Sequence, residues 1–158
     1  MNLDLKIIKA EQKEHYELVR NLFKEYAEDL AYTLDIQGFQ KEIETLPGEY
    51  AAPKGFILLA FVEKKAIGCV ALTKLDEEIC EMKRMYVRPE FRQKGVGRAL
   101  AEKTIEGARA IGYKKMWLDM LDSMKYALGL YESMGFVKIK PFRDVSLGGA
   151  VFMELNLE

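Results

Sequence analysis

A glycine-bearing basic segment carries the residue types best suited to binding an anion. It reads Arg92-Gln-Lys-Gly95-Val-Gly97-Arg98 and stands at the start of a helical pattern over residues 95–111. Glycine lets a backbone approach an anion closely, and the start of a helix presents unpaired N–H groups. From Lys83 to Arg98 six basic residues face one acid, a local charge of +5 in a chain of net charge −1. The segment is therefore either a pyrophosphate cradle or a solvated basic loop.

Two familiar nucleotide-binding motifs do not fit this segment. A P-loop needs Lys and then Ser or Thr after its second glycine, but Gly97 is followed by Arg98 and Ala99. A dinucleotide fingerprint needs a third small residue where Leu100 stands. Both motifs are excluded.

Composition restricts the class of protein further. The chain has 158 residues, 49% of them hydrophobic, which favours one domain over residues 1–158. With 24 basic and 25 acidic residues, it is not a polybasic protein that coats nucleic acid or a membrane surface. The longest apolar run, residues 56–62, is far shorter than the roughly 20 residues of a membrane helix. Two cysteines and one histidine are too few for a typical zinc site, so we expect a metal-free cytoplasmic domain.

Hydrophobic periodicity predicts a mixture of strands and helices. Strands are expected over 3–8, 56–63, 65–75, 78–87, 115–121, 136–140 and 151–157, and helices over 12–32, 39–46, 95–111 and 123–134. The resulting order, β-α-α-β-β-β-α-β-α-β-β, predicts a single α/β domain with a mixed sheet. On the strand over 78–87, simple alternation places Glu81 in phase with Met85 and Val87.

Two segments resemble the GNAT N-acetyltransferase superfamily. The first is Glu81-Met-Lys-Arg-Met-Tyr-Val-Arg-Pro-Glu-Phe-Arg-Gln-Lys-Gly-Val-Gly-Arg-Ala-Leu100, which matches the acyl-CoA-binding pattern Gln/Arg-x-x-Gly-x-Gly/Ala after Val-x-Pro. The second is Ala-x-x-Leu-Tyr-Glu-x-x-Gly-Phe at residues 127–136. The resemblance implies a GNAT-like fold and transfer of an acetyl group from acetyl-CoA to a primary amine of a small molecule or peptide. The alternative is a non-catalytic acyl-CoA sensor on the same fold.

The resemblance also implies a role for particular residues. Backbone groups of Met85, Tyr86 and Val87 would meet the pantetheine arm and the thioester oxygen. Arg92 belongs to the motif, and Gln93, Lys94, Gly95, Val96, Gly97 and Arg98 would wrap the pyrophosphate. Tyr131 would protonate the departing thiolate, and Glu81 would act as general base. Met124 stands where the family often has Asn. Homodimers are common in the family, and the strand over 151–157 is compatible with one.

The two expected catalytic side chains also have structural interpretations. Tyr131 shares a helix face with Ala127, Leu128 and Met134 and has the pattern of a core aromatic. Glu81 lies on what reads as a central strand, where a carboxylate is unusual without a partner such as Lys83 or an arginine.

Residues 25–50 hold seven acids against Lys41 alone. Such a segment suits either an acidic wall facing a cationic amine or two helices with solvated charged faces. Acceptor-lining candidates are Tyr32, Tyr50, Tyr126 and Arg143. Arg143 lies in the irregular segment 141–149, where its guanidinium suits an acceptor carboxylate. The acceptor is taken to be a small-molecule amine, with neither nucleic acid nor a membrane as partner.

Overall fold

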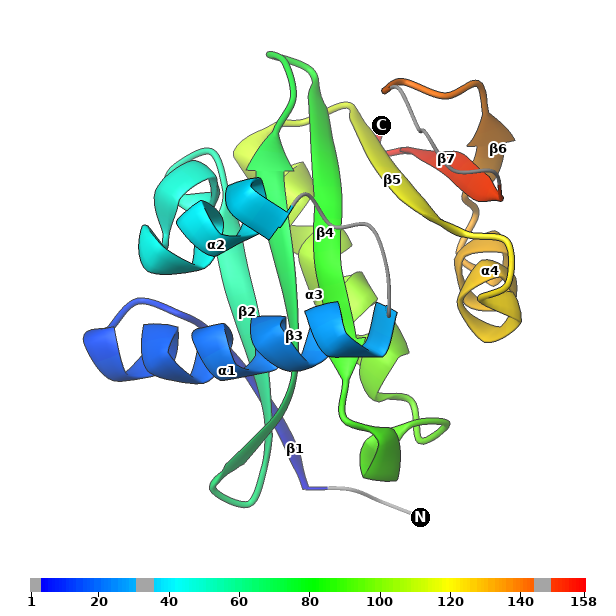
Figure 1. The fold of residues 1–158 in the computed structure, drawn as a ribbon. Helices are drawn as coiled ribbons and strands as arrows, with labels where there is room; N and C mark the ends of the chain where they lie inside the picture. Colours follow the sequence, from blue (N-terminus) through cyan, green and yellow to red (C-terminus); the bar gives the residue numbers. More distant parts are fainter. Residues whose placement is uncertain (1–3, 31–35, 144–148) are drawn as a thin grey trace.

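One seven-stranded sheet with helices on both faces forms the protein (Figure 1). A computed structural model describes residues 4–30, 36–143 and 149–158. The strands are β1 (Leu5–Lys9), β2 (Phe56–Val62), β3 (Lys65–Lys74), β4 (Ile79–Val87), β5 (Lys115–Leu121), β6 (Val137–Ile139) and β7 (Ala150–Asn156). The helices are α1 (Lys13–Leu30), α2 (Ile36–Glu44), α3 (Val96–Ile111) and α4 (Lys125–Ser133), with single 3₁₀ turns η1 (Gly48–Tyr50) and η2 (Pro89–Phe91).

The predicted order of strands and helices is confirmed. Strands lie side by side in the order β1-β2-β3-β4-β5-β7-β6, so β4 is the central strand. Neighbours are antiparallel except β4 and β5, which are parallel because α3 carries the chain back across the sheet between them. Among the described helices, none is long and apolar enough to cross a membrane.

Each face of the sheet builds its own core. Helices α1 and α2 cover one face, where Val19, Leu22 and Phe23 of α1 pack with Ile57 and Leu59 of β2. Helices α3 and α4 cover the other, where buried residues of α3 pack with the alternate β2 positions Leu58 and Ala60. Figure 1 shows α1 and α2 in front of the sheet and α3 behind it. Because both faces of β2 are covered, its sequence is a continuous apolar run without alternation, and that run is what predicted the strand.

The two parallel strands separate after a short paired stretch. Their register runs only from Ile79 opposite Lys115 to Glu81 opposite Trp117. Beyond that point β4 continues to Val87 and β5 to Leu121, and Figure 1 shows the two strands diverging. The β5-facing backbone edge of β4 is therefore free to bond an extended ligand, as an edge strand would.

A β-bulge interrupts β4, so the side-chain alternation predicted for this strand is wrong beyond the bulge. Cys69 of β3 lies opposite Tyr86 and Ala71 opposite Lys83, so one intervening residue of β3 faces two of β4. The extra residue reverses the side-chain phase, because successive side chains of a strand point to opposite faces. Met85 and Val87 consequently join Cys80 and Met82 in the core beneath α3. Glu81 is therefore out of phase with Met85 and Val87, contrary to the simple alternation.

Candidate active site

The start of α3 offers a row of unpaired backbone N–H groups. Gly95 is the N-cap with a φ of 87°, and no side chain caps the helix. Gln93 has a φ of 61°, so two left-handed residues frame the turn. The helix ladder begins with Ala99 N–H donating to the Gly95 carbonyl, and no bond between described residues uses the N–H groups of residues 93–98. Consecutive free N–H groups in such a turn form an anion-binding concavity.

The side chains around this turn divide into those already paired and those still available. Arg92 donates from Nε to the Val87 carbonyl at 2.7 Å and stacks over the Tyr86 ring at 5.5 Å. Arg98 donates to Ser133 Oγ at 2.7 Å and so ties the start of α3 to α4. Lys94 is exposed, and none of the ion pairs between described residues includes it. Lys94 therefore remains as a mobile counter-charge for an anion bound at the turn.

The basic and acidic segments largely neutralise each other. Four acids of α1, α2 and η1 pair with four bases of residues 83–92 on and just after β4, at separations between 2.7 and 3.3 Å. The pairs are Glu25–Arg88, Asp29–Arg92, Glu42–Arg84 and Glu49–Lys83. Much of the local charge seen in the sequence therefore fastens α1 and α2 to the central strand and is not free to attract a ligand.

Acid should weaken the fold through Glu25 and Glu42. Hydrogen bonds from Arg88 lower the pKa of Glu25. Burial acts to raise the pKa of Glu42, but its bonds from Arg84 and Tyr50 outweigh this, and the pKa lies below its ordinary value. A carboxyl with a lowered folded-state pKa stabilises the fold above its unfolded pKa, and this stability is lost as pH falls through the folded pKa.

The free energy of unfolding should therefore decrease as pH falls below 4.5, the ordinary pKa of a glutamate. Glu42→Gln should show a shallower decrease, because it removes one of the responsible carboxyls. Urea unfolding at several pH values between about 7 and about 3 measures both slopes. Equal slopes for the wild type and the variant would contradict the assignment to Glu42.

Tyr131 is buried in the core on the sheet face covered by α3 and α4, as the helix-face pattern indicates. Its ring meets Phe136 edge-on at 5.4 Å. Burial, with a smaller contribution from Tyr26 nearby, raises the pKa of Tyr131, so the phenol keeps its proton at neutral pH. Tyr131 can accordingly donate a proton, and no hydrogen bond to another described residue occupies its hydroxyl.

Glu81 is 1% exposed and is paired with an arginine. Arg143 donates to both of its carboxylate oxygens, at 2.6 and 2.7 Å, and to Asp119 at 3.3 Å. The guanidinium also lies over the Phe142 ring at 4.7 Å. Arg143, an expected contact for an acceptor carboxylate, is thus already engaged by two protein carboxylates. Each Glu81 oxygen keeps one further lone pair, so a water or amine can still bond to it.

The remaining predicted residues lie in different environments. Met85, Tyr86 and Val87 lie in the part of β4 beyond its last pair with β5. Tyr50 is 1% exposed and packs in the core under α1, so it contacts the acceptor region only through Glu42, which accepts its hydroxyl at 2.8 Å. Tyr126, on the first turn of α4, is 62% exposed. Tyr32 lies outside the described residues.

Asp119 and Tyr26 were missed as site residues. Asp119 follows Trp117 on the polar face of β5, where the strand has left β4, and it contacts Arg143. Burial raises the pKa of Tyr26, Arg84 lowers it, and the nearby Asp119 charge raises it again. Tyr26 also lies beneath the Arg84 guanidinium, whose Cζ is 5.6 Å from the centre of the ring. Alternation of Met116, Leu118 and Met120 with polar or aromatic residues was the available signal for Asp119.

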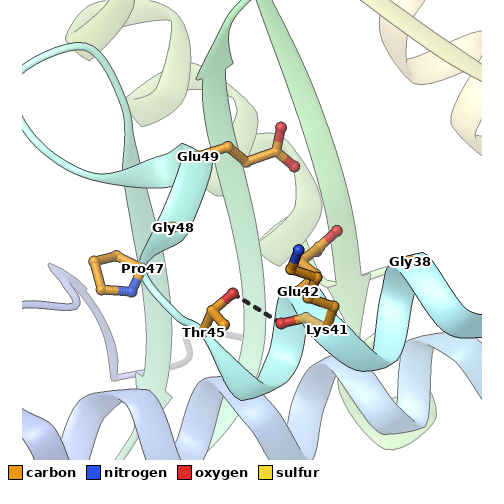
Figure 2. A pocket seen from close by; sticks show the side chains of 7 residues that line it. All are labelled: Gly38, Lys41, Glu42, Thr45, Pro47, Gly48 and Glu49. Atoms are coloured by element: carbon orange, nitrogen blue, oxygen red, sulfur yellow. Dashed lines mark hydrogen bonds between the residues drawn. The ribbon is translucent and has the colours of Figure 1, made fainter.

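A surface hollow of about 230 Å³ lies between α2 and η1 (Figure 2). It is lined by Gly38, Lys41, Glu42, Thr45, Pro47, Gly48 and Glu49. Neither Glu81 nor Tyr131 lines it, so this hollow is not where those two side chains would act together. Across residues 4–30, 36–143 and 149–158, no three His, Cys, Asp or Glu side chains are grouped to hold a metal ion.

Both the sequence and the fold match known acetyltransferases. A family model described as "Acetyltransferase (GNAT) family" matches residues 15–136. The chain belongs to this family and is an N-acetyltransferase. An uncharacterised N-acetyltransferase of Schizosaccharomyces pombe is 35% identical over 138 residues, covering 86% of this chain and 85% of the relative.

Solved structures have the same fold. A GNAT-family acetyltransferase of Staphylococcus aureus superposes with a TM-score of 0.81 at 22% identity, covering 98% of this chain and 99% of that one. An acetyltransferase of Salmonella typhimurium, solved with its cofactor acetyl-CoA, superposes with a TM-score of 0.73 at 20% identity over 98% of this chain and 94% of that one. These likenesses confirm the predicted α/β GNAT fold.

Proposed function

We propose that this N-acetyltransferase moves an acetyl group from acetyl-CoA to a primary amine of a small molecule or peptide, by direct attack in a ternary complex. The free N–H groups of residues 93–98, beside the open edge of β4, are the observation that carries the proposal. They can hold a pyrophosphate, while the open edge can bond the amide groups of a pantetheine arm. The acetyl-CoA complex of the Salmonella typhimurium protein supports this assignment.

In this proposal the protein holds acetyl-CoA mainly through backbone N–H and C=O groups, with only a minor contribution from side chains. Residues 93–98 bond the pyrophosphate, with Arg92 fixing the preceding turn and Lys94 adding charge. Met85, Tyr86 and Val87 bond the pantetheine arm, and an N–H of this stretch faces the thioester oxygen. Such a donor stabilises the negative charge that develops on that oxygen when the amine attacks.

Glu81 and Tyr131 would move the protons. An alkyl ammonium has a pKa near 10 and becomes nucleophilic only after losing a proton, which Glu81 takes directly or through one water. The amine nitrogen then bonds to the thioester carbon, the carbon–sulfur bond breaks, and Tyr131 gives its proton to the departing thiolate. The nitrogen, now part of the amide, loses its second proton to the Tyr131 oxygen, directly or through water, which restores the phenol. A thiol pKa of about 8.5 makes the thiolate a fair leaving group, so the contribution of Tyr131 is moderate.

The charges at the reacting centre favour a cationic acceptor. Glu81 and Asp119 carry two negative charges against the single positive charge of Arg143. The excess negative charge is centred near Asp119, whose bond to Arg143 is the longest of the three. An ammonium group is attracted to such a site. Tyr32 and Tyr126 remain proposed as lining residues.

Tyr131→Phe provides a direct test of the proposed chemistry. The variant keeps the ring that packs on Phe136, so its thermal stability and its acetyl-CoA affinity should stay near wild type. Its kcat should fall about tenfold, less than the roughly 10²–10⁴-fold usual for general acid–base catalysis, because the thiolate leaves fairly well unaided. The assay follows thiol release from acetyl-CoA across a panel of primary amines.

Thiol release by the wild type should require the amine, because no acyl-enzyme precedes attack. Accumulation of an acetylated protein with labelled acetyl-CoA alone would contradict direct transfer. The buried thiols do not suit that alternative, since burial raises the pKa of both Cys69 and Cys80 well above the range of a reactive cysteine.

A further inference from the structure

Arg84 occupies a backbone conformation that glycine would adopt more easily. Its φ is 61°, in the left-handed region, and it lies in the bulge of β4. A non-glycine residue in this conformation is strained unless its surroundings hold it there. The bulge matters for the site because Met85, Tyr86 and Val87 follow it directly. Without the extra residue, their side chains would point to the opposite faces of the sheet, and their backbone N–H and C=O groups would point to the opposite edges of the strand.

Arg84 is held by a network of side chains from α1, α2 and β3. Glu42 of α2 accepts from its Nε at 2.9 Å and from its Nη2 at 2.8 Å. The guanidinium lies over the rings of Tyr26 and Phe39, at 5.6 and 5.4 Å. The Arg84 carbonyl accepts the Cys69 thiol at 3.4 Å. A bidentate pair between two largely buried side chains fixes both position and orientation.

The Glu42 carboxylate is in turn fixed by a residue of the hydrophobic core. The hydroxyl of buried Tyr50 donates to its second oxygen at 2.8 Å, and the Tyr50 ring meets Phe23 of α1 edge-on at 6.2 Å. The contacts run from α1 through Tyr50 and Glu42 to Arg84 and the bulge. Rigid elements on the acceptor-side face of the sheet thus fix a backbone distortion on its central strand.

We propose that Glu42 is a positioning residue for acetyl transfer: acting through Arg84, it holds the β4 bulge that aims the backbone of Met85, Tyr86 and Val87 at the thioester. This inference rests on the proposed function. The pyrophosphate turn follows η2 in the chain, and none of the hydrogen bonds or ion pairs between described residues joins it to Glu42 or Arg84. Loss of Glu42 should therefore change the reaction step much more than donor affinity.

Glu42→Gln should lower kcat about tenfold or more, because a misplacement of the reacting groups by even 1 Å is costly. Its Kd for acetyl-CoA should stay within about twofold of wild type, and Glu42→Asp should recover part of the lost kcat. Glu49→Gln is the control. Glu49 of η1 likewise pairs with a base of β4, Lys83, at 3.3 Å, but Lys83 precedes the bulge residue Arg84 and does not have a left-handed backbone. Glu49→Gln should keep the wild-type kcat.

Substitutions of Arg84 test whether its left-handed backbone conformation is needed for activity. Glycine adopts a φ of 61° without strain and alanine does not, so Arg84→Gly should be several-fold more active than Arg84→Ala, although alanine is the closer replacement in size. In the Arg84→Gly background, Glu42→Gln should have little further effect, because its partner is gone. Circular dichroism melting of every variant identifies those that fail to fold.

The outcomes separate this inference from the proposed function. If the wild type releases no thiol with any amine, the proposed function fails. If the wild type is active but Arg84→Gly and Arg84→Ala are equally active, only the positioning role fails. A loss in Glu42→Gln that is equally large in the Arg84→Gly background, or that Glu49→Gln reproduces, would also overturn it.

Discussion

Glu81→Gln is expected to lower kcat by two to three orders of magnitude, which is within the usual range for loss of a general base. Glutamine has nearly the same shape and can still bond to Arg143, but it cannot accept the proton that the acceptor ammonium must lose. The measurement is steady-state thiol release at saturating acetyl-CoA. Raising the pH should recover part of the lost rate, because more of the amine is then already deprotonated.

The ion pair with Arg143 makes a second effect of this substitution predictable. The charge of Arg143 loses its main partner, which should lower the free energy of unfolding by about 1–3 kcal/mol, with Asp119 limiting the loss. The double variant Glu81→Gln/Arg143→Gln replaces the ion pair with two amides and should recover most of that stability. Its kcat should stay low. Recovery of activity together with stability would show that Glu81 serves the fold and not the proton transfer.

Gly95→Val is expected to weaken acetyl-CoA binding by one to two orders of magnitude. Gly95 has a φ of 87°, which valine cannot adopt without strain, although a Cβ there would meet no atom within 4 Å. Relief of the strain would turn the N–H groups of residues 93–98 away from a common anion. A hydrogen bond to a charged group contributes about 1.5–3 kcal/mol, so the loss of one gives this range.

Gly112→Val is the matched control for Gly95→Val. Gly112 ends the same helix, has a φ of 110°, and likewise has open space at its Cβ position. Both variants should lose similar amounts of thermal stability, but Gly112→Val should bind acetyl-CoA like the wild type. If the two variants bind equally, whether weakly or tightly, the turn at Gly95 is not the pyrophosphate site.

Local patterns explain why most of the fold was predictable. Each strand and helix has its own hydrophobic period, and glycines mark both ends of α3. The bulge at Arg84 was not predictable in this way, because it is stabilised by Glu42, which lies 42 residues away in sequence. A strict alternation therefore assigned Glu81, Met85 and Val87 to one face. The sequence does show the break, since Cys80 and Met82 are followed by Met85 and Val87 as the apolar positions.

The site was predictable only where its chemistry is local. The turn from Gln93 to Arg98 is one contiguous motif that works through its own backbone. By contrast, Glu81 and Arg143 are 62 residues apart, and sequence spacing gave only the general expectation of a charged partner. The acidic segment was ambiguous for the same reason. Its charges pair with Lys83, Arg84, Arg88 and Arg92, which only the folded chain brings within reach.

Calorimetric titration of the wild-type protein with acetyl-CoA, CoA and NAD⁺ tests the central claim most directly. The claim is that the turn before α3 and the open edge of β4 together bind an acyl-CoA. Acetyl-CoA and CoA should each bind at one site per chain, and NAD⁺, which has a pyrophosphate but no pantetheine arm, should bind far more weakly. Absence of acetyl-CoA binding, or equal binding of NAD⁺, would contradict the assignment of the site.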